Sequence, residues 1–591
     1  MKPDELAPKT DPIIGPGRVL SFEVERIGVP TIFAATHVER NASGAVMAAV
    51  VGPGPADSRS LLRWLERGCP DPAPQRQGFV ALLFRPDGHV TAAVSARNEV
   101  ALYFRHVDGH LIGSSSLKGL VARLPQTPSL DLQKLTDLCF EYDDPHRTWF
   151  VGLDRLPPSH VADFYPNRPP RVRRWFDPPV VPIDRRPLKS APEIMRETVR
   201  DAVEASLPAS GDVAASLSGG LDSTMIAATA ASILRSEGRE VHGFTHVPLS
   251  GTESGRTGWV ASDQATVECL VEATPGLSFE PVVSDQSWTV VAALLEQFRL
   301  TCSPHRNIAN ADWLLEIRKR VDQKGYALTL GGQSGNFGFS WNGSAGVDEF
   351  VRQGRPLGAY RHARERAGPA GASKATLKAL FPRAADCWLD FRHNRTAEPW
   401  QSRSGLRGAP TPGAIEAWAQ SVRGQGVGTQ AFRRRFLLAS PSYQAVAQPP
   451  ASISWRSDPL SDSEVLRLAL SIHPSAWRMG SDSRSVARSA MRGVVPDQVR
   501  LRRERGMQGA DGHLRLRHDP RGLDLSLDLI AGSPLASEFV DVAQIRREVI
   551  EGGHSSQAAY LGWCAGAGRL MGYALFVAWW DRVGIQDRIW R

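Results

Sequence analysis

The sequence of 591 residues contains few cysteines and no cluster of them. The six are Cys69, Cys139, Cys269, Cys302, Cys387 and Cys564, and none forms a CxxC pair. Such wide spacing excludes a zinc site of the finger type and argues against a disulfide framework. We therefore expect reduced thiols, as in a cytoplasmic protein.

Long apolar runs are also missing. No uninterrupted apolar stretch approaches the roughly 18 residues of a membrane span. The opening residues, MKPDELAPKTDP, have prolines and acids where a signal peptide needs an apolar core. The net charge of +8 comes from scattered arginines, without an aromatic RNA-binding signature. We expect neither a membrane nor a nucleic acid as partner; the basic surface is either merely solvated or attracts an anion such as ATP or an acidic peptide.

What the chain does contain falls into two parts. Residues 18–125 alternate short apolar runs with turns such as PDGH and VDGH, which predicts antiparallel sheet. A stretch rich in proline and arginine predicts a linker near residues 165–187. Strands and helices then alternate, and from about residue 350 the segments are mainly helical, which together predict an α/β fold with a doubly wound parallel sheet. We place the domains at residues 1–180 and 190–591.

The stretch SLSGGLDST, residues 216–224, carries the clearest chemical signal. We predict a strand at 212–217, a loop from Ser218 to Ser223 and then a helix, whose N-terminus suits phosphate. Gly219 and Gly220 let the backbone approach phosphate oxygens, and Ser218 and Ser223 add hydroxyl donors. Asp222 would repel a phosphate unless a cation lies between them, which points to Mg²⁺. Without a Walker lysine, the loop favours attack at the α-phosphate with pyrophosphate as the leaving group.

These residues resemble the PP-loop of ATP pyrophosphatases, specifically the asparagine synthetase-like branch. Further stretches similar to that family are SARNEVALYFRHVDGHLIGSSSLKGL near the N-terminus and SDSRSVARSAMRGVVPDQV in the C-terminal part. The resemblance implies an αββα, Ntn glutaminase-like domain followed by a PP-loop synthetase domain with a helical C-terminal part. It also implies ATP and Mg²⁺ as cofactors. The ATP-binding residues it implies are Leu217, Ser218, Gly219, Gly220, Leu221, Asp222, Ser223, Gly331 and Gly332.

The chain departs from the family in its N-terminal domain. Family glutaminases require a cysteine directly after the initiator methionine, where this sequence has Lys2. The first cysteine is Cys69, which is expected to be a core or loop thiol. The N-terminal domain is therefore predicted to make no ammonia and to remain as structure or as a surface that docks a peptide.

A second departure lies in GGQSGNFGFSWNG, residues 331–343. Asparagine synthetases have roughly GEGxDE here, which supplies a general base and a carboxylate for Mg²⁺. This chain has Gln333 at the base position, Asn336 at the metal-side position and Phe337 in place of the last acid. Glutamine cannot accept a proton, whereas the Asn336 carbonyl oxygen can still bind Mg²⁺, more weakly than a carboxylate would.

The pattern GQxGNxxxSWxG, with RRERGMQGADG further on, most resembles the cyclases of lasso peptide biosynthesis. Such enzymes adenylate an Asp or Glu side chain of a precursor peptide, whose own N-terminal amine then closes an isopeptide ring. This implies a precursor (core) peptide and a leader-removing cysteine protease as partners. Gln333 would orient the amine or the acyl carbonyl, and Arg505, at the place of a family lysine, would stabilise charge on the phosphates.

Two other functions stay open at this point. One is a beta-lactam synthetase-like enzyme or another amide ligase for a small substrate, although the tyrosine that beta-lactam synthetases carry at the Gln333 position is missing. The other is a catalytically inactive scaffold of the same fold, which the residues Gln333, Asn336 and Phe337 would fit. The intact PP-loop argues against the scaffold, because a decaying site has no reason to keep Asp222 beside two glycines.

Overall fold

The computed structural model describes most of the chain, in segments separated by short gaps. They are residues 21–24, 31–32, 37–42, 46–52, 58–71, 73–74, 78–97, 100–107, 110–178, 190–283, 290–344, 346–382, 405–422, 430–439, 454–479, 482–551 and 555–582.

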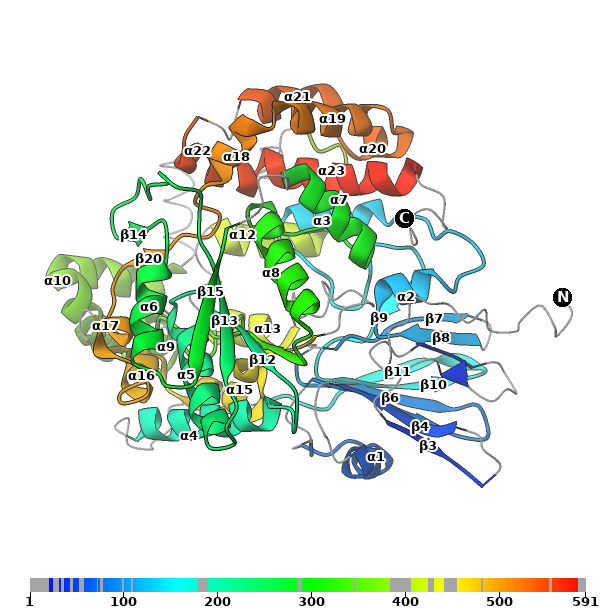
Figure 1. Ribbon diagram of the computed structural model, residues 1–591, viewed down its shortest axis with the longest axis horizontal. Coiled ribbons are helices and arrows are strands. Elements are labelled where there is room, and N and C mark those ends of the chain that lie inside the picture. Colours follow the sequence, from blue (N-terminus) through cyan, green and yellow to red (C-terminus); the bar gives the residue numbers. More distant parts are fainter. Residues whose placement is uncertain are drawn as a thin grey trace, which may run out of the picture.

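The described residues of the N-terminal part form two antiparallel sheets (Figure 1). The larger has the order β11-β10-β6-β5-β4-β3, with β3 His37–Arg40, β4 Val46–Val51, β5 Val80–Phe84, β6 Val90–Val94, β10 His160–Tyr165 and β11 Arg168–Arg174. The smaller has the order β2-β1-β8-β7-β9, with β1 Ser21–Val24, β2 Thr31–Ile32, β7 Tyr103–Val107, β8 His110–Ser114 and β9 Asp154–Arg155. The predicted antiparallel sheet is confirmed.

Tight turns explain why neighbouring strands pair in this part. In the PDGH turn the Arg85 amide donates to the His89 carbonyl oxygen at 2.9 Å, which closes the β5–β6 hairpin. The second predicted turn, VDGH, connects β7 to β8, and Val107 pairs with His110. Its residues 108 and 109 lie outside the described residues.

The two sheets pack face to face, with helices outside each. Phe104 of β7 and Phe164 of β10 meet between the sheets, with ring centroids 4.9 Å apart. On the outer face of the larger sheet, α1 (Ser58–Glu66) buries Trp64 against Phe79 and its neighbours. On the outer face of the smaller sheet lie α2 (Leu117–Val121) and α3 (Leu132–Cys139). The layers therefore run helix, sheet, sheet, helix.

The prediction of a linker at residues 165–187 is wrong for its first part. Residues 168–174 form β11, which pairs with β10 at the edge of the larger sheet. An edge strand tolerates Pro169 and Pro170, because proline has no amide hydrogen to donate to a neighbouring strand. Residues 179–189 lie outside the described residues, so the predicted boundary between 180 and 190 stays a prediction.

A parallel sheet forms the centre of the second part, with the order β15-β13-β12-β16-β17 (Figure 1). Its strands are β12 Val213–Ser216, β13 Val241–His246, β15 Leu277–Val282, β16 Leu328–Leu330 and β17 Trp455–Ser457. Helices cover both faces of the sheet. Successive side chains of β12 point to opposite faces, so Val213 and Ala215 belong to one hydrophobic cluster and Ala214 belongs to another. The first cluster includes α4 (Ala191–Ser206), α5 (Leu221–Arg235) and α6 (Gln264–Glu272), and the second includes α8 (Ala311–Lys324). The predicted parallel sheet with flanking helices is confirmed.

The remaining described residues are mainly helical, as predicted. The longer helices are α7 Val290–Thr301, α9 Gly346–Arg352, α10 Pro356–Leu380, α12 Pro412–Val422, α13 Gln430–Ala439, α15 Ser463–Ser471, α18 Gly512–His518, α19 Pro520–Ala531, α21 Val542–Glu551, α22 Gln557–Ala565 and α23 Ala567–Arg582. Among the described helices no single one has the length and hydropathy of a membrane span, although α22 and α23 meet that test together as a pair bent by 49°.

The C-terminal helices and the N-terminal part share a hydrophobic core. Phe150 packs against Trp580 of α23 with ring centroids 4.6 Å apart, and the Trp580 indole Nε1 donates to the Pro128 carbonyl oxygen at 3.1 Å. Leu135 of α3 and Phe298 of α7 lie in the same cluster. The two predicted domains are therefore held together by buried apolar contacts.

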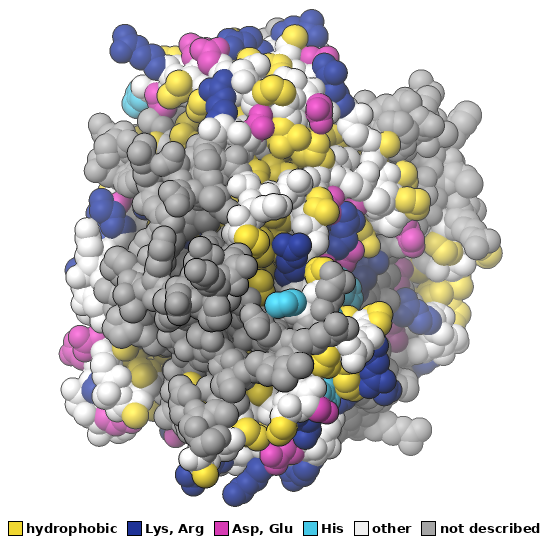
Figure 2. Space-filling view, turned by 90° about the vertical axis from the view of Figure 1, so that its right-hand side faces the viewer, with side chains coloured by type: hydrophobic (Ala, Val, Ile, Leu, Met, Phe, Trp, Pro, Cys, Tyr) yellow, Lys and Arg dark blue, Asp and Glu magenta, His cyan; other side chains and the backbone are white. Residues whose placement is uncertain are grey.

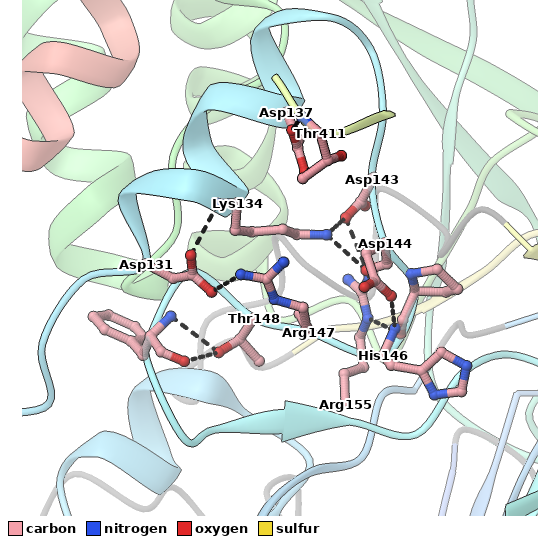
Figure 3. A network of polar contacts seen from close by, with 12 residues as sticks. Asp131, Lys134, Asp137, Asp143, Asp144, His146, Arg147, Thr148, Arg155 and Thr411 are labelled. Carbon is pink, nitrogen blue, oxygen red and sulfur yellow. Dashed lines mark hydrogen bonds and ion pairs between the residues drawn. The ribbon is translucent and has the colours of Figure 1, made fainter. Parts of the chain in front are cut away.

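A buried polar network lies at the same junction (Figure 3). Lys134 is fully buried and forms an ion pair with Asp143, to which Arg155 Nη2 also donates at 3.4 Å. Although burial raises it, Arg155 and Lys134 hold the pKa of Asp143 below its ordinary value. Asp137 of α3 accepts from the amide and the hydroxyl of Thr411 at 2.8 and 2.9 Å. This last contact ties α3 to the segment that enters α12.

Figure 2 shows the side of the molecule that carries the N-terminal sheets. Over the helices at its top, acidic and basic side chains are interspersed, with hydrophobic side chains between them. The described side chains at the top of this face therefore carry charges of both signs.

Candidate active site

The glycine-rich stretch lies at the carboxyl edge of the parallel sheet, where β12 ends. The chain runs from β12 outward to β13 and β15, then returns to β16 on the other side of β12. Open parallel sheets bind ligands at such a change of winding direction. Helix α5 begins at Leu221, so Asp222 and Ser223, which were predicted to lie in the loop, belong to its first turn. The helix begins earlier than predicted because Gly220 is already its extended N-cap residue.

Hydrogen bonds of its serines and of the Leu217 amide fix the conformation of the loop. The Ser218 amide donates to Ser223 Oγ at 3.2 Å, and the two serine hydroxyl oxygens lie 3.1 Å apart. The Leu217 amide is used by the sheet, since it donates to the Phe244 carbonyl oxygen at 2.9 Å. Leu217 and Leu221 point into the core below the loop. The two leucines thus anchor the loop, while the serines line it.

Gly219 is required by both conformation and space. Its φ of +63° lies in the left-handed region, which other residues adopt only with strain. A Cβ there would lie 3.1 Å from the Asp263 side chain and 3.3 Å from Arg502 Nη1. Arg502 in turn donates to Asp263 Oδ1 at 2.7 Å. The Arg502–Asp263 pair therefore packs directly against the loop backbone.

Asp222 is enclosed by the turn that follows β16. Ser340 Oγ donates to Asp222 Oδ2 at 2.8 Å, and Gly332 and Gly335 pack so closely that a Cβ on Gly335 would overlap the carboxylate. Asp222 Oδ1 is shielded from solvent and accepts no hydrogen bond from the residues that the structure describes. Burial raises the pKa of Asp222 to about 6, although the Ser340 hydrogen bond lowers it. A buried carboxylate oxygen without a donor is a position that a cation would satisfy.

The predicted residues of the 331–340 loop, which follows β16, lie in different surroundings. Gly331, Gly332 and Asn336 come near the PP-loop: β16 pairs with β12, and Asn336 Oδ1 lies 3.5 Å from Nη2 of Arg484, which faces Asp222. Gln333 is exposed on the same turn. Phe337 turns away from Asp222 and packs on Phe436, with ring centroids 4.1 Å apart.

Arg484 is a residue of the site that the sequence analysis missed. It is half-buried, its guanidinium lies in the field of both Asp222 and Arg505, and burial lowers its pKa. Its φ of +63° is left-handed, although it is not a glycine. Such strain is often retained at functional positions, but it is visible only in the backbone angles. Arg484 lies within the stretch SDSRSVARSAMRGVVPDQV, whose resemblance to the family is the one sequence signal for it.

Arg505 lies on β20 (Arg505–Gly506), which pairs in parallel with β14 (Trp259–Val260). Its side chain is exposed, with the guanidinium carbon 5.7 Å from the centroid of the Trp259 ring. Arg505 is therefore near Arg484 but at the rim of the site, and its predicted role stays a prediction.

The residues present can accommodate a cation without forming a complete metal cage. Among the described residues no three His, Cys, Asp or Glu side chains form a group that could hold a metal ion. Asp222 Oδ1 has no donor among the described residues, and Asn336 Oδ1 lies 3.5 Å from Nη2 of Arg484, whose charge acts on Asp222. This set suits Mg²⁺, which keeps several waters and takes few protein ligands when it binds together with a nucleotide.

Cys69 does not resemble a displaced nucleophile. It is buried in the cluster beneath α1, and burial raises the pKa of its thiol to about 11 in spite of nearby Arg173. A thiol with so high a pKa is almost entirely protonated at neutral pH, and the thiolate is the nucleophile. Lys2 lies outside the described residues, so its comparison with the glutaminase cysteine stays a prediction.

We therefore expect the purified protein not to release glutamate from glutamine, and Cys69→Ala to leave ligase activity unchanged. A coupled glutamate dehydrogenase assay measures the first and substrate turnover the second. Glutamate release that disappears in Cys69→Ala would contradict this view of the N-terminal domain.

A comparison with protein families finds a match over the segment that contains the PP-loop. The asparagine synthase family model matches residues 195–282 and 451–569. These segments contain the PP-loop, Arg484 and Arg505, whereas the 331–340 loop falls between them. Over these two segments the chain is similar to the asparagine synthase family, and Gln333 and Asn336 lie outside the matched residues.

Two individual proteins show a limited similarity to this chain. The chain is 29% identical to amidase chyE of Penicillium rubens over 138 residues, which are 23% of this chain and 20% of that protein. A glutamine phosphoribosylpyrophosphate amidotransferase from B. subtilis, solved with ADP and GMP, aligns over 54% of this chain and 75% of its own. That alignment has 9% identity and a TM-score of 0.16, too low to carry an argument.

Proposed function

We propose that this protein is an ATP-dependent amide ligase that closes a macrolactam ring in a ribosomally made, lasso-type peptide. The observation that carries the ligase assignment is Asp222, held beneath the PP-loop with an unsatisfied buried oxygen. A carboxylate in that position would only repel a nucleotide unless a cation joined them. The combination therefore suits ATP bound with Mg²⁺ at the carboxyl edge of the sheet.

Each residue of the site then has a task in the first step. Ser218, Ser223 and the backbone of Gly219 and Gly220 would bind pyrophosphate at the N-terminus of α5. Asp222 and Asn336 would hold Mg²⁺, which supplies neutralisation of phosphate charge when bound. Arg484, with Arg505 at the rim, would stabilise charge that grows on the α-phosphate and the leaving group. A carboxylate oxygen of the substrate attacks the α-phosphorus, and the bond to pyrophosphate breaks.

The second step forms the amide bond. The peptide's N-terminal amine attacks the acyl carbon, AMP leaves, and one amine proton is lost to solvent or to pyrophosphate. Exposed Gln333 can orient the amine or the carbonyl by hydrogen bonds, but it cannot take the proton. Holding the two groups of one peptide together supplies much of the acceleration, on the order of 7–11 kcal/mol.

Substrate and partners rest on the resemblance of the 331–343 and 502–512 segments to lasso peptide cyclases. The proposal includes a leaderless core peptide as substrate, a cysteine protease that removes the leader, and a cytoplasmic location. A beta-lactam synthetase-like ligase for a small substrate is the second candidate, because the same PP-loop would serve it. An inactive scaffold is the third.

The proposed function predicts a product lighter than its linear substrate by one water. The substrate is a peptide with a free N-terminal amine and an Asp or Glu several residues along the chain. Acetylating the amine should block ring closure and spare carboxylate-dependent exchange of pyrophosphate into ATP. Tandem mass spectrometry locates the new bond, and ³¹P NMR identifies the nucleotide products.

Two outcomes would redirect the assignment. ADP and phosphate in place of AMP and pyrophosphate would overturn the adenylation chemistry. Activation of small amino-acid-like acids, with no dehydration of any tested core peptide, would favour the beta-lactam synthetase-like alternative.

A further inference from the structure

Arg97 carries a contact from the N-terminal sheets into the ligase part. It follows β6, and only 6% of its surface is exposed. Its Nη1 donates to the carbonyl oxygen of Leu437 in α13 at 3.1 Å, and its guanidinium carbon lies 5.8 Å from the centroid of the Phe436 ring. The Ser95 hydroxyl fixes the backbone here by donating to the Arg97 carbonyl oxygen at 3.0 Å. Arg97 is thus placed firmly against α13.

Helix α13 in turn holds the active-site loop. The Phe436 ring packs on Phe337, and Arg433 Nε donates to the Phe337 carbonyl oxygen at 2.5 Å. Arg433 Nη2 donates to the Gly338 carbonyl oxygen at 3.2 Å, and the Arg433 side chain is fully buried above the Trp341 ring. Two residues of the 331–340 loop are therefore positioned by one helix.

Another contact holds the other end of this loop. Asp458 is buried, and its Oδ2 accepts from the Ser334 amide at 2.7 Å. Burial raises the pKa of Asp458, and hydrogen bonds from Ser334 counter that rise more than the charge of Arg97 does. The Asp458 carboxylate thus holds the start of the loop through the Ser334 amide.

The 331–340 loop encloses Asp222 through the hydrogen bond of Ser340 Oγ and the close approach of Gly335. A displacement of about 1 Å in catalytic geometry can cost about 10²-fold in rate. We infer that Arg97 is a positioning residue of the ligase site: the N-terminal domain, through Arg97 and α13, fixes the 331–340 loop over Asp222. The catalytic part of this inference rests on the proposed function, whereas the positioning part does not.

The positioning part is tested by hydrogen–deuterium exchange of peptides that span residues 331–340. Arg97→Met keeps the length of the side chain and removes its charge and donors. Exchange in these peptides should become at least tenfold faster in Arg97→Met and stay near wild type in Arg97→Lys. The matched control is Arg569→Met, which breaks another contact between the two parts, the 3.1 Å ion pair of Arg569 with Glu141. It should leave exchange in the loop unchanged.

The catalytic part is tested by steady-state kinetics of pyrophosphate exchange. Arg97→Met should lower kcat about 10- to 100-fold with little change in KM for ATP, because ATP contacts lie elsewhere in the site. Arg97→Lys should recover part of the loss, and Arg569→Met should retain the wild-type kcat.

Each failure has a distinct meaning. Unchanged loop exchange in Arg97→Met, or an equal change in Arg569→Met, overturns the inference and leaves Arg97 as one interface contact among others. Faster loop exchange together with an inactive wild type would support the positioning role and refute the proposed function.

Discussion

Replacing Asp222 with asparagine is expected to lower the rate of carboxylate-dependent pyrophosphate exchange by about 10³-fold, or about 4 kcal/mol of transition-state stabilisation. The amide keeps the size of the side chain and an oxygen acceptor for Ser340, which donates to Oδ2 at 2.8 Å. It removes the negative charge that would hold Mg²⁺ beneath the phosphates. Glu237→Gln, an exposed change beyond the far end of α5, is the matched control and should retain full activity.

The same substitution should not destabilise the protein at pH 8. In the folded state burial raises the pKa of Asp222 to about 6 from its ordinary value of 3.8. The folded chain therefore binds this proton more tightly than the unfolded chain, and the resulting stability is lost as the pH rises through about 6. Asparagine does not ionise, so without Mg²⁺ and ATP the Tm of Asp222→Asn at pH 8 should equal or exceed that of wild type.

That advantage should vanish near pH 4, where wild-type Asp222 is mostly protonated in the folded state. Differential scanning calorimetry at both pH values measures it. A lower Tm of the variant at pH 8, together with lost activity, would instead assign Asp222 a structural role.

Replacing Arg484 with alanine should lower kcat for adenylation by about 10² to 10³-fold, the range observed when one group that stabilises developing charge is removed. Arg484 faces Asp222 and lies 3.5 Å from Asn336 Oδ1, so its guanidinium sits beside the predicted metal position. Arg484→Lys should recover part of the rate, since lysine keeps the charge but lacks the planar pair of donors. Rapid-quench measurement of acyl-adenylate formation separates this step from ring closure.

Arg503→Ala provides the control for Arg484. Arg503 lies in the adjacent arginine-rich segment, its side chain is 80% exposed, and it forms a surface ion pair of 3.3 Å with Asp482. Because such pairs contribute little, its loss should alter neither rate nor Tm measurably. If Arg484→Ala remained active while Arg505→Ala lost the rate, the charge that stabilises the phosphates would belong to Arg505, as the sequence alone predicts.

Local patterns explain why much of the fold could be predicted. The run Val213–Ser216, followed by two glycines and an apolar helical segment, predicts a buried strand and a helix whatever surrounds them, and both exist within a few residues of the expected bounds. The stretch at 168–174 misled the prediction, because two prolines and four arginines are typical of a linker. Its pairing with β10 depends on a neighbour in space, and its edge position makes the prolines harmless.

For the active site, the sequence by itself determined which residues are predicted to bind phosphate, because the PP-loop is contiguous and its predicted chemistry depends on residue types at fixed spacing. Only the tertiary structure decided what surrounds Asp222, since Ser340, Arg484 and Asp458 come from distant parts of the chain. The same holds for Arg97 and Leu437, which are 340 residues apart and meet only when the N-terminal sheets pack on α13. Burial, electrostatic field and backbone strain depend on which residues pack together in the folded chain, and a local sequence pattern does not predict those neighbours.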